Sequence, residues 1–166
     1  LLQRETRLGA GASSSSDDEV TSIAPALVDG DGESIAGSEI VICGFNKVGQ
    51  TIASFIQQTE LDGKELGSSS VMRYVGFDLD PKVVMESFRD GKRVLYGDGS
   101  LPMVLETAGI DSPKLFIITY DEFPVVLRSV ERLRQSFPSV PIFARASQQV
   151  YCNPLIEAGA TRVLSD

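Results

Sequence analysis

The residues most suggestive of chemistry form a glycine turn at residues 39–49, which read EIVICGFNKVG. A short apolar run ends at the turn and a helical pattern follows it. Free N–H groups and the positive end of a helix dipole would therefore face an anion such as phosphate. Gly44, Asn46 and Gly49 stand at the three glycine positions of the dinucleotide-binding fingerprint, where Gly44 makes the tight turn and Gly49 lets the helix pack closely.

Asn46 stands where the backbone of that fingerprint approaches a phosphate. Asparagine tolerates a left-handed φ, so the turn can still form. Its side chain, however, takes up space that a pyrophosphate would need. The residue therefore disfavours a dinucleotide and leaves room for a mononucleotide, with the side-chain amide donating to a phosphate. A strand–helix turn without any ligand is the alternative interpretation.

A carboxylate follows the next predicted strand, in the sequence YVGFDLDP at residues 74–81. Asp78 ends this apolar run, at the position where an acid accepts hydrogen bonds from ribose hydroxyls. Because the same carboxylate would repel a 2′-phosphate, NADP is disfavoured. Asp80 is a second candidate, but it precedes Pro81, and a proline at the first helical position predicts that Asp80 caps a helix.

Further polar residues follow the later strands, at the carboxyl edge where open α/β sheets bind ligands. Asp98 lies in the sequence YGDGS, and its alternative is to cap the helix that begins at Pro102. Thr119 and Tyr120 end the next strand. Arg145 ends the strand after that, where it would either reach a phosphate or form a structural ion pair.

Alternating apolar strands and amphipathic helices predict how these residues are positioned. The predicted strands cover residues 39–43, 71–78, 93–96, 114–119, 141–144 and 162–164. The predicted helices cover residues 48–58, 81–90, 102–108, 124–137 and 149–158, and a polar surface loop covers residues 60–70. Six strands joined by five helices specify an α/β fold, a Rossmann-like doubly wound parallel six-stranded sheet with strand order 3-2-1-4-5-6.

The helix expected at residues 124–137 has two distinct sides. Its apolar stripe predicts a side that faces the core and consists of Val126, Val130, Leu133 and Phe137. The remaining, exposed side is a candidate surface for dimerisation.

Composition excludes several classes of function. The 166 residues carry a net charge of −8, whereas binding to nucleic acid requires an excess of Lys and Arg. The chain has no His, the commonest metal ligand and general base. Cys43 and Cys152 form no zinc pattern, and Cys43 is expected to be a buried thiol. No apolar run approaches the roughly 20 residues of a membrane helix. We therefore expect no catalytic residue, no metal site, no nucleic-acid partner and no membrane insertion of this part of the chain.

Residues 1–38 differ from the rest in composition and read as a disordered acidic linker or tail before a domain at residues 39–166. They include four consecutive serines at residues 13–16, and they hold two basic and seven acidic residues. The chain does not start with Met, and its first residues lack the apolar core of a signal peptide, which indicates a fragment.

One part of this acidic segment is similar to a calcium-binding loop. Asp29, Asp31 and Glu33 fall at positions 1, 3 and 5 of the loop template. However, Ser34 replaces the glycine of the sixth position and Ile40 replaces the glutamate of the twelfth. A solvated acidic linker is therefore the favoured interpretation.

Several sequence phrases together resemble one known family. They read VICGFNKVGQ, YVGFDLDPKVV, VLYGDGSLPMVLETAGI, IFARA and EAGATRVL. Over residues 39–166 they are similar to the nucleotide-binding N-lobe of RCK domains, also called KTN or TrkA-N-like domains, which regulate potassium channels and transporters. The phrases resemble in particular those of potassium efflux antiporters of plant and algal plastids, in the cation:proton antiporter-2 family.

The resemblance implies a regulatory domain that binds an adenine nucleotide (ATP, ADP or AMP) and gates K+/H+ exchange. It implies a membrane-embedded antiporter domain in the same polypeptide and a homodimer. It also implies a chloroplast location, at the stromal face of the thylakoid or envelope, with the cytoplasmic face of a membrane as the alternative. The middle glycine of the family is replaced by Asn46, which makes NAD(H) less favoured. The nucleotide-binding residues that it implies are Gly44, Phe45, Asn46, Lys47, Val48, Gly49, Asp78, Leu79, Asp80, Gly97, Asp98, Gly99, Thr119, Tyr120 and Arg145.

Three other functions remain open on the sequence. The first is an NAD(H)-binding regulatory lobe of a potassium channel or transporter. The second is a Rossmann module for interaction or dimerisation that binds no ligand. The third, the cofactor half of a nicotinamide dehydrogenase, is disfavoured because the chain has no His and no Tyr followed four residues later by Lys.

Overall fold

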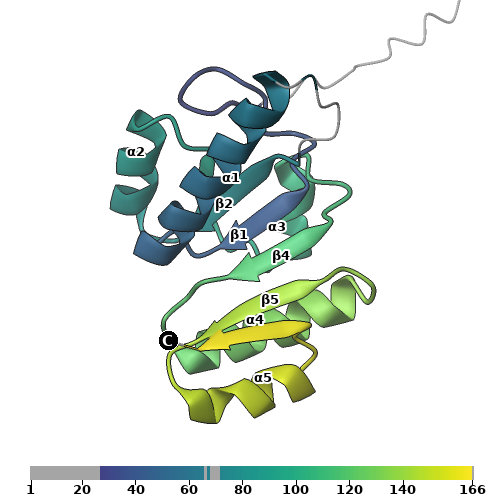
Figure 1. Cartoon of the computed structure of the whole chain (residues 1–166). Coiled ribbons are helices and arrows are strands. Elements are labelled where there is room, and N and C mark those ends of the chain that lie inside the picture. The colour runs from purple at the N-terminus through teal and green to yellow at the C-terminus, as the bar shows by residue number, and fades with distance from the viewer. Residues whose placement is uncertain (1–26, 66, 68–71, 166) are drawn as a thin grey trace, which may run out of the picture.

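The computed structural model describes residues 27–65, 67 and 72–165. They form a parallel sheet with helices on both faces (Figure 1). The strands are β1 (Ile40–Cys43), β2 (Tyr74–Asp78), β3 (Val94–Tyr96), β4 (Leu115–Ile118), β5 (Ile142–Ala146) and β6 (Arg162–Ser165). The helices are α1 (Lys47–Glu65), α2 (Pro81–Arg89), α3 (Pro102–Thr107), α4 (Phe123–Ser136) and α5 (Cys152–Glu157), with a 3-10 turn, η1 (Gln149–Tyr151), before α5. The order β3-β2-β1-β4-β5-β6 confirms the predicted doubly wound, Rossmann-like sheet.

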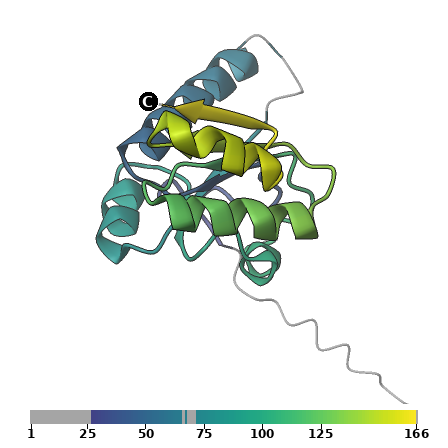
Figure 2. The same cartoon turned by 90° about the horizontal axis from the view of Figure 1, so that it is seen from below.

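Alternate residues of β1 build the two halves of the core. Val41 and Cys43 pack on the side that α3, α4 and α5 cover, whereas Ile40 and Ile42 pack on the side of α1 and α2. Figure 2 shows α1 and α4 on opposite faces of the sheet. The predicted apolar stripe of α4 is confirmed as part of the core, which contains Val126, Val130 and Leu133, with Phe137 packed against it.

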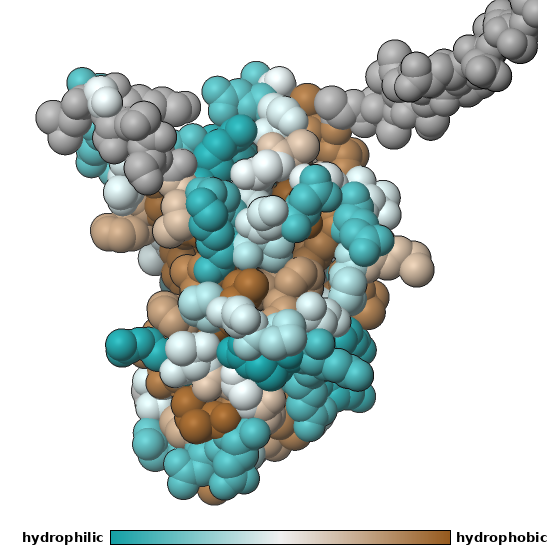
Figure 3. Space-filling model, turned by 90° about the vertical axis from the view of Figure 1, so that its right-hand side faces the viewer, coloured by the Kyte–Doolittle hydropathy of each residue, from teal (hydrophilic) through white to brown (hydrophobic). Residues whose placement is uncertain are grey.

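The connections that follow the neighbouring strands β1 and β4 run to opposite faces of the sheet, and a crevice for a ligand can form between them. β1 leads into α1 on one face, and β4 leads into α4 on the other, so the two connections diverge where the strands end. Ligands of open parallel sheets bind in this crevice outside the carboxyl ends of the strands. These ends lie at the left of Figure 1, and the opposite side of the molecule, which faces the viewer in Figure 3, shows hydrophilic residues interspersed with hydrophobic ones. None of the helices in the described residues has the length and hydropathy to cross a membrane.

The prediction that Cys43 is a buried thiol is confirmed, since its side chain on β1 is fully buried. Burial, and after it the negative charge of Asp98, raises the pKa of the Cys43 thiol far above its usual range. We expect a thiol reagent at pH 8 to label the half-buried Cys152 in the native protein but to label Cys43 only after unfolding. Mass spectrometry of labelled peptides measures this difference, and equal labelling rates for the two native thiols would contradict it.

Helix α1 is longer than the sequence predicts. The predicted helix ends at Gln58 and is followed by a loop, whereas the observed helix continues to Glu65. The physical reason is the buried ion pair between Glu60 and Arg93. The helical conformation of the backbone at residue 60 places the Glu60 side chain where it can form this pair. A glutamate in a polar stretch gives no sign of this long-range partner.

The last predicted helix, at residues 149–158, is divided in the structure. Its first turn is the 3-10 turn η1, and the α-helix starts only at Cys152. Pro154 explains the division, because it has no N–H to donate to the carbonyl of Val150 and its ring would clash with that carbonyl. Within the first turn of α5 the missing N–H costs nothing.

Residues 27–38, here called the strap, are packed on the domain. Ile35 is completely buried in the core, and a β-bridge joins Val28 to Ser34. The Asp29 carboxylate shapes the turn between them, since its Oδ1 accepts hydrogen bonds from the N–H groups of Asp31 (3.1 Å) and Glu33 (2.8 Å). The predicted disordered linker therefore does not extend over the strap, and the remainder of that prediction, residues 1–26, lies outside the described residues.

Arg93 fastens the strap to the body of the domain. Its guanidinium donates to the two carboxylate oxygens of Glu60 at 2.7 and 3.1 Å, and its Nε lies 3.3 Å from Oδ2 of Asp29. The three side chains are 3–6% exposed. Burial disfavours the charge on Arg93, but the hydrogen bonds and attraction of Glu60 outweigh it and raise the pKa of Arg93. In the described part of the chain no group of three or more His, Cys, Asp or Glu is arranged to hold a metal ion.

Candidate functional site

The turn between β1 and α1 requires glycine at two positions. Gly44 has φ +95°, and a Cβ there would lie 2.9 Å from the ring of Tyr120. A Cβ on Gly49 would lie 2.4 Å from the carbonyl oxygen of Gly44. The same carbonyl accepts a 2.7 Å hydrogen bond from the Thr119 hydroxyl at the end of β4. The turn is therefore held tightly between α1 and β4, as the glycine pattern predicts.

Asn46 caps helix α1. Its Oδ1 accepts hydrogen bonds from the N–H groups of Val48 (3.0 Å) and Gly49 (3.1 Å). Its Nδ2 donates to the carbonyl oxygen of Thr119 at 2.6 Å and lies 3.3 Å from Oδ2 of Asp121. Two of the N–H groups that a phosphate would use at a helix start are thus already bonded within the protein.

The other residues of the turn present different groups to the cleft. The ring of Phe45 is buried in the core and lies parallel to that of Tyr74, so only the backbone of Phe45 is available at the site. Lys47 is exposed at the first position of α1. Val48 points instead to an apolar pocket beside β4 and β5. The sequence predicts that these residues lie at the turn and the start of the helix, but it does not reveal that Phe45 faces inward.

Asp78 lies beside the glycine turn at the end of β2. Its Oδ2 accepts a 2.6 Å hydrogen bond from the N–H of Phe45, and its Oδ1 accepts one of 2.9 Å from the N–H of Asp80. Asp80 itself accepts from the N–H of Lys82 at 2.9 Å and is the N-cap of α2, as Pro81 predicts. Asp78 therefore holds the turn, and it is the only one of the two acids that borders the cleft described next.

A cleft of about 300 Å³ opens between the ends of β2, β3 and β4 and the start of α4. It combines sequence-predicted residues with three that the sequence reasoning missed, Asp121, Glu122 and Val125. Its lining consists of Asp78, Leu79, Asp98, Tyr120, Asp121, Glu122 and Val125. The only signal for the missed residues is their place after β4, at the edge where such sheets bind ligands.

Asp98 contributes a paired carboxylate to this cleft. Its Oδ1 accepts from the N–H and the hydroxyl of Ser100, at 2.9 and 2.7 Å, and its Oδ2 lies 3.1 Å from Nη1 of Arg132. The alternative interpretation of Asp98 as a helix cap is wrong, because Leu101 is the N-cap of α3 and has no side-chain cap. The flanking Gly97 and Gly99 pack near Phe77, behind the cleft.

Tyr120 places a hydroxyl under the cleft without a hydrogen-bond partner in the described residues. Burial raises the pKa of this phenol far above its usual range, with the negative charges near it, Asp98 and Asp78 among them, adding to the effect. The hydroxyl therefore stays protonated and is a neutral donor. The site offers no ionised phenolate for chemistry.

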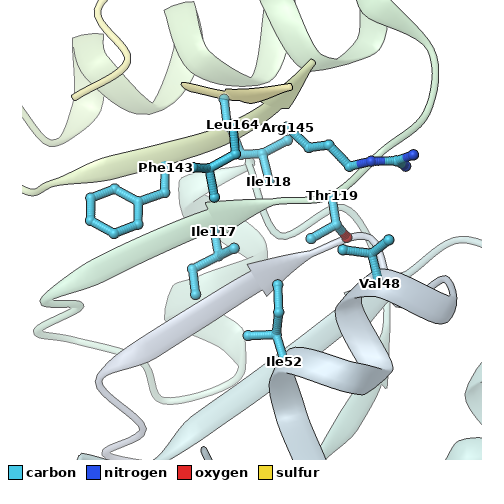
Figure 4. A pocket seen from close by; sticks show the side chains of 9 residues that line it. Val48, Ile52, Ile117, Ile118, Thr119, Phe143, Arg145 and Leu164 are labelled. Atoms are coloured by element: carbon cyan, nitrogen blue, oxygen red, sulfur yellow. The ribbon is translucent and has the colours of Figure 1, made fainter. Parts of the chain in front are cut away.

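Arg145 reaches the same edge from β5. Figure 4 shows its side chain extending beyond the apolar pocket, on the side where Thr119 lies. The guanidinium forms an ion pair with the carboxylate of Asp121. Arg145 is mostly buried (19% exposed), whereas Asp121 is 67% exposed. Arg145, which the sequence suggested as a phosphate ligand or a structural ion-pair residue, is therefore paired with an acid in the structure.

Solved structures share this fold. The structure described as Shewanella denitrificans Kef CTD in AMP bound form has a TM-score of 0.60 and 21% identity, covering 76% of this chain and 70% of that one. GsuK bound to ADP has a TM-score of 0.61 and 23% identity, covering 77% of this chain and 30% of that one. The GsuK channel bound to NAD has a TM-score of 0.61 and 24% identity, covering 81% and 22%.

Sequence comparison gives a nearer relative. The chain is 43% identical over 122 residues to the chloroplastic K(+) efflux antiporter 3 of Arabidopsis thaliana, covering 74% of this chain. The match spans only 15% of that relative's length. Residues 40–166 match the family model described as the TrkA-N domain. The resemblance drawn from the sequence phrases is thereby confirmed, and the chain belongs to the TrkA-N domain family.

Proposed function

We propose that this domain binds an adenine nucleotide (ATP, ADP or AMP) and thereby regulates K+/H+ exchange by an antiporter. The observation that carries the proposal is Asp78, whose carboxylate borders the cleft beside the glycine turn. Each of its oxygens accepts one backbone N–H. A carboxylate has about four acceptor positions, so two remain for the hydroxyls of a ribose.

The polar groups around the cleft suit binding rather than catalysis. Asp98 is paired with Arg132, and Asp121 is paired with Arg145. The chain has no His to act as a general base. We therefore assign the domain to regulation and not to an enzyme.

The relatives support the regulatory context of the proposal. The Arabidopsis relative is a chloroplastic potassium efflux antiporter, and the fold neighbours were solved with AMP, ADP and NAD. We propose that this domain is joined to a membrane-embedded antiporter domain in the same polypeptide, acts as a homodimer and lies in the chloroplast. A nucleotide would then shift the antiporter only by binding one arrangement of the domains more tightly than another.

The geometry at Asn46 favours AMP, with its single phosphate, over ligands that carry a pyrophosphate, NAD(H) among them. A pyrophosphate uses several N–H groups at the start of the first helix. Here the N–H groups of Val48 and Gly49 are bonded to Asn46, so a dinucleotide would first have to displace this cap. The NAD-bound fold neighbour keeps NAD(H) as the second candidate ligand.

Isothermal titration calorimetry with AMP, ADP, ATP and NADH tests the proposal. We expect Asp78→Asn to weaken adenine-nucleotide binding at least about tenfold, because hydrogen bonds to a charged acceptor contribute roughly 1.5–3 kcal/mol. The isosteric amide can still accept from the N–H of Phe45, so the turn is expected to fold. Asp80→Asn is the matched control, since this exposed acid caps α2 and does not border the cleft.

Two outcomes would contradict the proposal. Absence of binding heat with all four nucleotides, confirmed by an unchanged melting temperature in their presence, would leave a module without a ligand. Equal affinities for the wild type, Asp78→Asn and Asp80→Asn would show that nucleotide binds elsewhere.

A further inference from the structure

We propose that the Asp121 carboxylate is an internal competitor for nucleotide phosphate, so that the site discriminates between nucleosides and their phosphates through displacement of this side chain. The inference rests on the proposed function and names a determinant of specificity within it. Asp121 belongs to the segment between β4 and α4. It is part neither of the glycine turn nor of the proposed ribose contact at Asp78.

The contacts of Asp121 are those that a bound phosphate would make. One carboxylate oxygen pairs with Nη1 of Arg145, and the other lies 3.3 Å from Nδ2 of Asn46. These are a cationic donor from β5 and an amide donor at the start of α1. An anionic oxygen held between a guanidinium and the first turn of a helix is the arrangement in which proteins bind phosphate. Here a side chain of the protein supplies that anion.

The exposures of the two partners make an exchange feasible. Asp121 is 67% exposed, so its carboxylate can turn into water with little loss of contacts. Arg145 is only 19% exposed, so its guanidinium gains more from an anionic partner than a surface cation does. Phosphate entering the site would take the place of the carboxylate at Arg145, and Asp121 would move to solvent.

Charge in the cleft explains why the exchange discriminates between ligands. Asp98 is held by Arg132, and Asp78 is held by backbone N–H groups. A phosphate that approaches Arg145 and Asn46 therefore meets Asp121, because this carboxylate contacts both residues. A nucleoside has no anion to place there, so it can bind at Asp78 while Asp121 stays in position.

Titrations of the whole chain with adenosine and AMP at low salt test this inference. We expect Asp121→Asn to bind AMP at least about fivefold more tightly than the wild type, because both the competing anion and its repulsion of phosphate are removed. Its affinity for adenosine should stay the same. Glu122→Gln is the matched control, since Glu122 lines the same cleft and its replacement also removes one negative charge, and its effect on AMP should be clearly smaller.

The outcomes separate this inference from the proposed function. If the wild type binds AMP and Asp121→Asn binds it equally or more weakly, the competitor role is wrong and nucleotide binding stands. If Asp121→Asn tightens adenosine and AMP by the same factor, or if Glu122→Gln tightens AMP as much, the effect is general and the inference also fails. If the wild type and both variants bind neither ligand, the inference and the proposed function fall together.

Discussion

Arg93→Met is expected to lower the free energy of unfolding by about 3–5 kcal/mol. The substitution keeps an apolar stem but removes the cation that faces the buried carboxylates of Asp29 and Glu60. Removing one partner of a buried ion pair leaves an uncompensated buried charge, which costs far more than loss of a surface pair. Arg73 compensates only in part, since its Nε lies 3.8 Å from Oε1 of Glu60. Urea denaturation followed by circular dichroism measures the change.

Lys92→Met is the matched control for this result. Lys92 is the preceding residue, and its ammonium donates to Ser54 and Gln57 rather than to a buried carboxylate. Its replacement should change stability by less than about 1 kcal/mol. Combining Arg93→Met with Glu60→Gln and Asp29→Asn should regain part of the loss, because the stranded charges are then removed. A loss below about 1 kcal/mol for Arg93→Met alone would show that the network does not hold the strap.

Gly49→Ala is expected to destabilise the protein by about 1–3 kcal/mol and to weaken nucleotide binding at least about tenfold. In an ordinary helix this change stabilises by roughly 1 kcal/mol. Here the new Cβ would lie 2.4 Å from the Gly44 carbonyl oxygen and 3.2 Å from the Thr119 hydroxyl. The obstructing oxygen belongs to the backbone, so relief requires α1 to move away from β1. Thermal unfolding and calorimetry with AMP measure the two effects.

Thr51→Ala provides the comparison within the same helix. Thr51 is exposed, and its hydroxyl bonds only to the backbone carbonyl of Lys47 among the described contacts. The free energy of unfolding of Thr51→Ala should lie within about 0.5 kcal/mol of the wild-type value, and its affinity for nucleotide should be unchanged. Should Gly49→Ala instead prove as stable as Thr51→Ala, the close approach of α1 to the turn would not be a constraint.

The architecture could be predicted from the sequence because its signals are local. Each strand is a short apolar run between turn residues, and right-handed crossovers then leave one strand order for this pattern. The glycine turn was predictable for the same reason, since the spacing of Gly44 and Gly49 after a strand is a local pattern, although the atoms that crowd Gly44 belong to Thr119 and Tyr120 at the end of β4. The placement of Asp78 followed from the strand that it ends.

The features that could not be predicted from the sequence depend on pairs of residues that are distant in the sequence. Arg93 meets Glu60 across 33 residues, and neither residue differs in type from a surface charge. Asp121 meets Asn46 across 75 residues and belongs to no motif. The packing of the strap was missed because Asp29 belongs to an acidic stretch and looks solvated until its buried partner Arg93 is known. Sequence periodicity carries no information on such pairs.

Helix α1 links the two ends of the molecule. At one edge, the Asn46 cap at its start lies beside Asp121 of the cleft. About 20 Å further along the helix axis, at the other edge, Glu60 binds Arg93. The polypeptide enters the domain at that far edge, through Asp29. A pull on the incoming chain would thus be carried along the axis of α1, whose opposite end lies beside the proposed nucleotide site, so tension on the chain and ligand binding would act on the same helix.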